Sequence, residues 1–262
     1  MKKVETSKQN KLENLVEQCL KCNRCHLRKN VTQVVPGSGN ANATIMFIGE
    51  APGAHEDKQG VPFVGAAGKF LDELLESINL RREDIYIANT IKCRPPNNRD
   101  PLTEEKEKCK PWLEEQLRII NPKIIIPLGR HALNELLPDV SISSAHGKTY
   151  IADVSPIGKR TIFVMYHPAA ALYNGSLRKV LLKDMKNLQL LLDKKLGDEK
   201  EPDMKKGDSS EIEKESSTIK ISLKNKSKSK YESVEEVKRI MEEKRLSRVE
   251  GCEDRSKQIT LF

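Results

Sequence analysis

The sequence predicts a three-layer α/β/α fold with a central, mostly parallel, four-stranded sheet, followed by a disordered C-terminal tail. Four short apolar runs rich in β-branched residues are bounded by Gly, Pro or Asn, as buried strands usually are. Patterns typical of amphipathic helices separate these runs, and such alternation favours a parallel sheet covered by helices. Only 37% of the 262 residues are hydrophobic, so part of the chain is not expected to fold.

The four runs predicted as strands share a high content of β-branched residues and flanking turn signals. Ligand-binding sites in open α/β sheets lie at the carboxyl ends of the strands, so we expect functional residues in the segments that follow the runs. The predicted strands are Thr44–Ile48, Asp84–Ala88, Lys123–Pro127 and Thr161–Tyr166.

Five helices are predicted from apolar residues spaced three and four apart. In the first of them, Leu12, Leu15 and Cys19 lie at positions i, i+3 and i+7. The third opens with Thr103 as its expected cap, followed by acidic residues but without Glu at the capping-box position. The predicted helices are residues 9–20, Gly68–Ile78, Thr103–Ile120, Arg130–Leu137 and Leu177–Leu192.

The C-terminal quarter differs from the rest of the chain in charge. Residues 197–262 contain 16 basic and 16 acidic side chains, so the net charge of +8 lies in residues 1–196. We therefore predict a folded domain over 1–196 and a charged low-complexity tail over 197–262, with a disordered linker at Lys205–Lys230 and a short charged helix at Tyr231–Val249. A basic folded domain suits a polyanionic partner, most commonly nucleic acid.

Two classes of protein are excluded by simple features of the sequence. The N-terminal residues lack the apolar core of a secretory signal, so no targeting signal is predicted. No run of about 18 apolar residues is present, so no membrane association is expected. We therefore expect a cytoplasmic protein.

The cysteines are spaced as metal or cluster ligands rather than as a disulfide framework. Cys22 and Cys25 form a CxxC pair, and Cys93 with Cys109 can complete a four-thiolate site for zinc or an iron–sulfur cluster. The 16-residue spacing of the second pair favours iron–sulfur, because zinc sites usually repeat the short spacing. Cys19 competes for a place, but it fits better as a small apolar residue on the first helix. Cys252 lies in the tail and receives no ligand role.

Polar residues follow three of the predicted strands. Glu50 lies in the Gly-rich turn Gly49–Gly53, Asn89 ends the second strand, and His167 follows the last. Each has a purely structural explanation, since turns and strand ends commonly carry such residues. Together they place a carboxylate, an amide and an imidazole at one sheet edge, which suits recognition of a small planar polar ligand.

The motifs GEAPGAHED, PFVGAAGKFLDELL, NTIKCRPPNNRDP and YHPAAALYN follow one another between about Cys22 and Leu192. In this set the chain resembles the family 4 uracil-DNA glycosylases, the iron–sulfur branch of that superfamily. The resemblance implies an enzyme of base excision repair that flips uracil out of DNA and hydrolyses its N-glycosidic bond. No lysine is placed as an amine nucleophile, so we expect an abasic product without strand cleavage. We also expect a monomeric enzyme that associates with the nucleoid.

The same resemblance implies a structural [4Fe–4S] cluster. The family pattern CxxCxL matches Cys22, Cys25 and Leu27, which leaves Cys19 outside the ligand set. Cys93 and Cys109 fall where the family has its other two ligands.

Residues of the uracil pocket also follow from the resemblance. Glu50, Ala51 and the backbone of their turn would line it and hold the water. Phe63 would stack on the flipped base, and Asn89 would read its N3–H and O4 edge. His167 would donate a hydrogen bond to O2, and Glu56 would occupy the place of the thymine methyl. Phe63 as a core residue and Glu56 as an acid at a helix N-terminus are the structural alternatives.

Hydrolysis also requires an activated water, and here the sequence departs from a related family. The family 1 enzymes have Asp where this chain has Ala51, so the base is either Glu50 or a backbone carbonyl of the turn. The loop Ala169–Arg178 would enter the minor groove. Either Leu172 or Tyr173 would act as the wedge, and Arg178 is a further predicted DNA contact.

The tail carries a second resemblance at Ser256–Phe262. Gln258, Leu261 and Phe262 resemble the motif by which DNA-repair proteins bind the sliding clamp PCNA, although two further residues and a second aromatic are lacking. The alternative is an apolar end without function. A tethered docking peptide of this kind would let the enzyme scan nearby DNA at high effective concentration.

Overall fold

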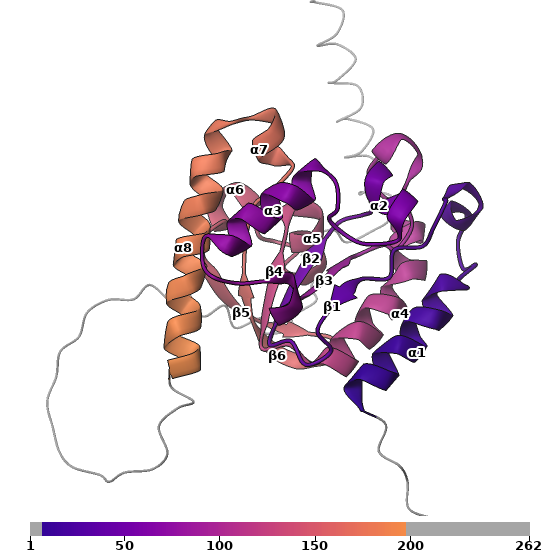
Figure 1. Cartoon of the computed structure of the whole chain (residues 1–262), viewed down its shortest axis with the longest axis horizontal. Coiled ribbons are helices and arrows are strands. Elements are labelled where there is room, and N and C mark those ends of the chain that lie inside the picture. Colours follow the sequence, from indigo (N-terminus) through magenta and orange to yellow (C-terminus); the bar gives the residue numbers. More distant parts are fainter. Residues whose placement is uncertain (1–6, 198–262) are drawn as a thin grey trace, which may run out of the picture. The chain divides into compact units, whose positions relative to one another are not determined.

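The computed structural model describes residues 7–197, and its central feature is a mostly parallel sheet. All four predicted strands are present and pair in parallel. The predicted three-layer α/β/α class is confirmed, with helices on both faces of the sheet (Figure 1). The four strands are β2 (Ile45–Gly49), β3 (Tyr86–Asn89), β4 (Ile124–Pro127) and β6 (Gly158–Phe163).

The prediction of four strands was wrong in number, because the sheet has six in the order β1-β3-β2-β4-β6-β5. Both additional strands pair antiparallel at the edges: β1 (Ser38–Gly39) with β3, and β5 (Thr149–Val154) with β6. Strand β1 is only two residues long, and β5 alternates buried with more exposed residues. Neither resembles the continuous apolar run of a central strand, which explains why the search for such runs missed them.

The predicted helices are confirmed, with boundaries shifted by at most a few residues, and short helices join them. The long helices are α1 (Lys8–Leu20), α3 (Ala66–Glu76), α4 (Thr103–Ile120), α5 (Gly129–Leu136) and α8 (Ser176–Gly197). The short ones are α2 (Ala54–Gln59), α6 (Ile142–Ala145), α7 (Ala170–Tyr173) and the 3₁₀ turns η1 (His26–Asn30), η2 (Arg82–Asp84) and η3 (Pro96–Asn98).

One expected helix cap was wrong. Leu102, not Thr103, precedes the first helical residue of α4. Glu105 therefore occupies the third helical position, where its Oε2 accepts the Leu102 N–H at 2.8 Å. The predicted cap was one residue too late in the chain, so Glu105 was not recognised as the capping-box acid of this helix.

Alternating side chains of the strands divide the interior into two apolar layers. Met46 and Ile48 of β2 pack with α1, α4 and α5 on one face, whereas Ile45 and Phe47 pack with α3 and α8 on the other. In Figure 1, α1 and α4 lie side by side, away from α3 and α8. The sheet is thus buried on both faces, as parallel sheets require.

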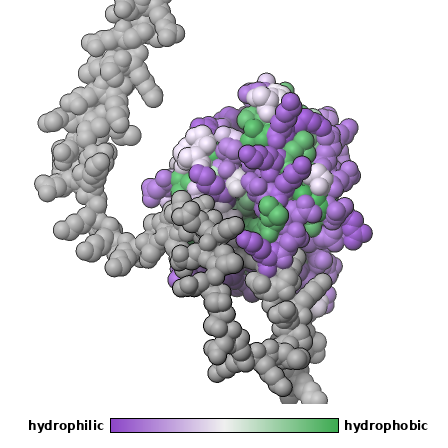
Figure 2. Space-filling view, turned by 90° about the vertical axis from the view of Figure 1, so that its left-hand side faces the viewer, coloured by the Kyte–Doolittle hydropathy of each residue, from purple (hydrophilic) through white to green (hydrophobic). Residues whose placement is uncertain are grey.

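The predicted tail, from residue 198 onward, lies outside the described residues, and so do Cys252, the helix expected at Tyr231–Val249 and the proposed clamp peptide. None of the helices within residues 7–197 combines the length and apolar character that a membrane span needs. On the face shown in Figure 2, hydrophobic areas are separated by hydrophilic side chains.

Candidate active site and cysteine cluster

The predicted pocket residues meet at the carboxyl edge of the sheet. Glu50 follows β2, Asn89 ends β3 and His167 follows β6, and all three line one cavity of about 460 Å³. The cavity is also lined by Ala51, Pro52, Gly53, Glu56, Phe63, Ala67, Pro95, Asn98, Arg99, Asp100, Ala169, Ala170 and Tyr173. Because β3, β2, β4 and β6 are neighbours in the sheet, residues distant in sequence converge here.

Asn89 provides a polar group without a partner beside this cavity. Its side chain is buried, and its Oδ1 is the buried side-chain polar atom that lacks a hydrogen bond within the described residues. Gly49 permits this approach, because a Cβ there would collide with Asn89 Oδ1 and lie 2.8 Å from the Phe63 ring. An orphaned amide oxygen in a cavity is costly unless a ligand supplies the donor.

Phe63 lies against the same cavity in a strained backbone conformation. Its φ of 54° is in the left-handed region, which aromatic residues rarely adopt. Arg82 holds this turn by donating to the carbonyls of Pro62 and Phe63. The Phe63 ring is 5% exposed and stacks on the His167 ring with centroids 5.4 Å apart. Phe63 is therefore a core residue as well as a pocket residue, so the two sequence interpretations do not exclude each other.

The half-buried His167 is neutral at physiological pH. Removal from water lowers the pKa of this imidazole to about 4, although nearby Glu56 opposes the shift. The backbone N–H of Ala169 donates to Nδ1 at 3.1 Å. Since Nδ1 accepts, the proton of the neutral ring lies on Nε2, which is available as a donor.

Glu56 lines the cavity and is held by three backbone donors. Its Oε1 accepts the N–H groups of Val64 and Gly65 at 2.9 and 2.8 Å, and its Oε2 accepts that of Gly53 at 3.1 Å. Glu56 and Asp57 both lie in the first turn of α2, as the structural alternative required. The Glu56 carboxylate is thus a rigid part of the wall that connects the two turns around the pocket.

The other side of the cavity is charged, and here sequence reasoning missed two residues. His131 Nε2 lies 3.3 Å from Asp100 Oδ2 and 3.7 Å from Glu50 Oε2. Burial, followed by the like charge of Asp100, raises the pKa of Glu50 above its usual range. His131 lies in the segment after β4, one of the strand-end segments that merited inspection, so its position was a usable signal. Asp100 lies in the motif NTIKCRPPNNRDP, but no role was assigned to it there.

The four cysteines predicted as ligands line a second cavity. Cys22 and Cys25 come from the turn between α1 and η1, Cys93 follows β3, and Cys109 lies in α4. Cys19 does not line this cavity and is buried on α1, as the sequence predicted.

The surroundings of these thiols suit ligands that become thiolates. The Trp112 indole N–H donates to Cys22 Sγ, and the Lys92 backbone N–H donates to Cys109 Sγ, each at 3.2 Å. Burial raises the pKa of Cys93 to about 12 and that of Cys109 to about 11, so a bound cation is needed to deprotonate them. The four sulfurs and their N–H donors therefore fit a metal or iron–sulfur group.

Comparison with known proteins agrees with this geometry. The family model described as the uracil DNA glycosylase superfamily matches residues 36–189. The chain belongs to this superfamily. It is 48% identical over 190 residues to the type-4 uracil-DNA glycosylase of Archaeoglobus fulgidus, covering 70% of this chain and 94% of that protein. The type-4 enzyme of Sulfurisphaera tokodaii is 46% identical over 69% of this chain and 84% of its own length, and that of Thermotoga maritima 42% identical over 70% and 95%. Within the superfamily the chain is a type-4 member.

The residues predicted to contact DNA occupy different places around the glycosylase pocket. Leu172 and Tyr173 lie in α7 and are 51% and 92% exposed, but only Tyr173 lines the cavity. Arg178 lies in α8, outside the cavity lining, where it pairs with Glu73 and its guanidinium covers the Phe70 ring at 4.5 Å. Arg178 is therefore tied to α3, whereas α7 presents free side chains at the mouth of the pocket.

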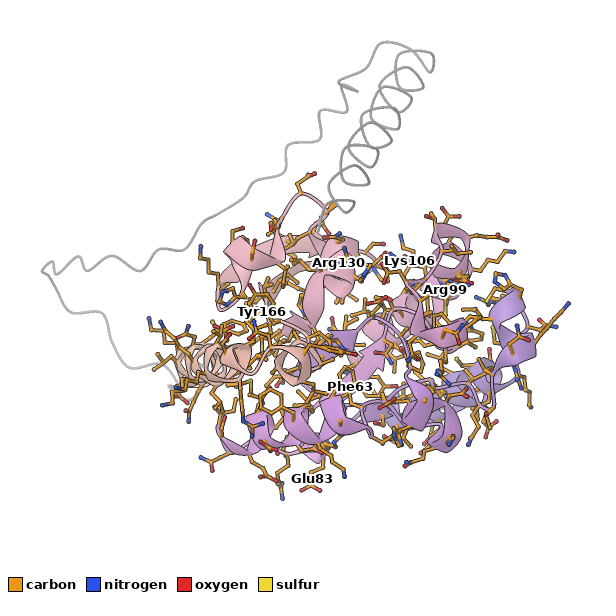
Figure 3. The ribbon with its side chains drawn as sticks, turned by 90° about the horizontal axis from the view of Figure 1, so that it is seen from above. Phe63, Glu83, Arg99, Lys106, Arg130 and Tyr166 are labelled. Carbon is orange, nitrogen blue, oxygen red and sulfur yellow. The ribbon has the colours of Figure 1, made fainter. Side chains whose placement is uncertain are left out.

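A buried carboxylate connects the cysteine turn to the glycosylase pocket. Glu105, whose side chain has no exposed surface, pairs with His26 Nε2 at 2.8 Å and with the Arg99 guanidinium at 2.6 and 2.8 Å. His26 follows Cys25 of the cysteine cluster, and Arg99 precedes Asp100 at the pocket. Figure 3 shows Arg99, Lys106 and Arg130 gathered on this side of the domain. A group that orders the cysteine turn thus supports the pocket wall.

Proposed function

We propose that this protein excises uracil from DNA by hydrolysing the N-glycosidic bond. The observation that carries the proposal is the unpartnered Asn89 Oδ1 beside a stacking ring and a neutral imidazole. Uracil offers an N3–H donor for Asn89 Oδ1, a carbonyl O4 for the amide N–H and a flat face for Phe63. Cytosine has an acceptor at N3, which would face the amide oxygen and leave it unsatisfied.

His167 would stabilise the charge that develops on the departing base. As the C1′–N1 bond breaks, its electron pair moves onto uracil and spreads to O2, while the sugar becomes oxocarbenium-like. A donor on His167 Nε2 interacts more strongly with this anionic O2 than with the carbonyl of the bound base, and such differential binding accelerates the reaction. A neutral imidazole can do this without transferring its proton.

The Glu50 carboxylate is the favoured base for the attacking water. The Gly49 carbonyl already accepts the Thr90 N–H at 2.9 Å, and the Glu50 carbonyl accepts the Ile91 N–H at 3.1 Å and the Thr90 hydroxyl at 2.7 Å. These bonds leave neither carbonyl well placed to accept a water proton. The Glu50 side chain lines the cavity and can accept it as the water oxygen bonds to C1′.

The same arrangement supports a monofunctional enzyme acting on a flipped base. Extrusion of a base from a duplex costs a few kcal/mol, which stacking on Phe63 and the polar contacts offset in part. Exposed Tyr173 at the cavity mouth, with Leu172 beside it, suits a side chain that fills the gap. The cavity lining within the described residues includes no lysine to attack C1′, so the product would be an abasic site for later repair steps.

An oligonucleotide containing one uracil tests this function. After incubation with the protein, hot alkali should cut the strand at the uracil position, whereas untreated product should stay intact. Strands with cytosine or thymine at that position should remain uncut. Strand breaks without alkali would contradict the monofunctional mechanism, and an intact uracil strand would contradict the function itself.

We propose further that Cys22, Cys25, Cys93 and Cys109 hold a [4Fe–4S] cluster. When bound, this group would cross-link the N-terminal turn, the segment after β3 and α4. Replacing each of the four by Ser should lower the iron content of anaerobically purified protein, whereas Cys19→Ser and Cys252→Ser should not. Zinc in place of iron, or iron loss in Cys19→Ser, would contradict the assignment.

The clamp-binding role of Gln258, Leu261 and Phe262 stays a prediction from the sequence. Deleting 258–262 should abolish retention on an immobilised sliding clamp and leave excision on a free oligonucleotide unchanged. Equal retention of the truncated and full-length chains would refute it.

A further inference from the structure

We propose that His131 is a positioning residue that holds the Glu50 carboxylate ionised and aimed at the pocket, apart from Asp100. The inference rests on the proposed role of Glu50 as the base. It starts from geometry: one carboxylate oxygen of Glu50, one of Asp100 and a ring nitrogen of His131 all lie within 4.8 Å of one another. These residues come from three separate segments, the turn after β2, the loop before α4 and the first turn of α5.

Two carboxylates this close repel each other, and a proton on one of them relieves the repulsion. A protonated Glu50 cannot accept a proton from water. His131 Nε2 lies close to both carboxylates, at 3.7 Å from Glu50 Oε2 and 3.3 Å from Asp100 Oδ2. Both neighbours favour the tautomer with hydrogen on Nε2, and a donor there stabilises the ionised carboxylates.

Other charges around the imidazole leave this role to His131. Arg130 Nη2 binds Asp100 Oδ2 at 3.0 Å, on the exposed side of the group. Lys106 Nζ pairs with Glu135 at 3.3 Å. Neither Arg130 nor Lys106 forms an ion pair with Glu50, although both lower the pKa of Glu50 over a longer distance. The titratable and charged groups that face His131 are Glu50, Asp100, Lys106, Arg130 and Glu135.

The test is the acid limb of the pH profile of single-turnover excision. In His131→Leu this limb should move to higher pH by about one unit, because the Glu50 carboxylate loses the electrostatic stabilisation of the nearby imidazole N–H. Below the limb, the rate should fall about tenfold for each such unit, while binding of a duplex with a non-cleavable uracil analogue stays unchanged. His131→Gln, which retains an N–H in reach, should recover part of the shift.

Asp100→Asn provides the opposite test, because it removes the like charge beside Glu50. Its acid limb should move to lower pH. Asp100 is well exposed, so this variant is expected to fold. Asn134→Ala, an exposed change on the helix α5 that carries His131, should leave the pH profile unchanged.

Two results would overturn the role of His131 alone: an unchanged limb in a His131→Leu protein that melts like the wild type, or a limb that moves the same way in His131→Leu and Asp100→Asn. Absence of uracil excision by the wild-type chain would instead refute the proposed function and this role with it.

Discussion

The two sides of the pocket are built on different physical principles. Phe63, Asn89 and His167 form a side that is neutral at physiological pH, with Phe63 and Asn89 buried and His167 half-buried. Glu50, Asp100 and His131 form a side with two carboxylates that is partly open to solvent, with Asp100 63% exposed. On the first side, removal from water keeps the one titratable group, His167, uncharged. On the second side, contact with water allows the carboxylates to stay ionised.

In the proposed mechanism, the difference separates recognition of the base from hydrolysis of its bond to the sugar. An uncharged planar base binds best where water is excluded, since hydrogen bonds and stacking are strongest there. An ionised base for water must remain partly hydrated, or its pKa would rise until it is protonated. Substitutions on the two sides should therefore fail in different ways.

The largest effects are expected on the neutral side. His167→Ala should lower the single-turnover rate by about 10²–10³-fold, the usual loss for one donor to a developing anion, with little change in binding. Asn89→Ala should weaken binding of the flipped base and also slow cleavage of its bond to the sugar. Wild-type rates in both variants, measured with saturating enzyme, would remove these residues from the site.

A smaller loss is expected when the neutral side is displaced without removing a functional group. In Gly49→Ala the new methyl would collide with the Asn89 amide and the Phe63 ring. Overpacking of this kind costs about 1–3 kcal/mol of stability, and it should lower excision of uracil. Asn134→Ala, an exposed change on α5 outside the pocket, is the control. Equal excision by the two variants would show that Asn89 needs no such close approach.

Glu56 belongs to neither side, and its substitution should alter selectivity by a modest factor. Glu56→Ala would open space beside the base, and discrimination against thymine should fall by about 1–3 kcal/mol. Loss of its three backbone bonds should also loosen the Phe63 turn and slow uracil excision. Glu56→Gln keeps the side-chain volume and should still reject thymine. Unchanged thymine rejection in Glu56→Ala would assign the exclusion to another residue.

The smallest expected effect on excision is that of His167 titration. Because its folded pKa is about 4 and its ordinary value is 6.5, excision should show no limb near pH 6.5 from this residue. Its contribution to stability is complete above pH 6.5 and is lost as the pH falls toward 4, by about 3 kcal/mol at most. Urea unfolding of wild type and His167→Gln between pH 7 and pH 4 checks this: the acid-induced loss should be smaller in the variant.

Features encoded by local pattern could be predicted from the sequence. The strands β2, β3, β4 and β6 and the helices between them follow from side-chain periodicity, because burial on two faces selects apolar runs. The strand-end positions of Glu50, Asn89 and His167 then follow from the direction of the chain. The ligand set proposed for the cysteines and the roles proposed for Phe63 and Glu56 stay predictions, and they required resemblance to a family as well, since spacing alone left zinc and Cys19 open.

Other features depended on contacts between segments far apart in the chain. The sequence by itself determined a basic α/β domain with polar groups at one sheet edge and a CxxC motif near its start. Only the tertiary structure placed His131 beside Glu50 and Asp100, tied Arg178 to Glu73 and paired the edge strands β1 and β5 with their neighbours. It also left Asn89 Oδ1 without a hydrogen-bond partner among residues 7–197. Periodicity reports which face of an element is buried, whereas these outcomes depend on what that face meets across the fold.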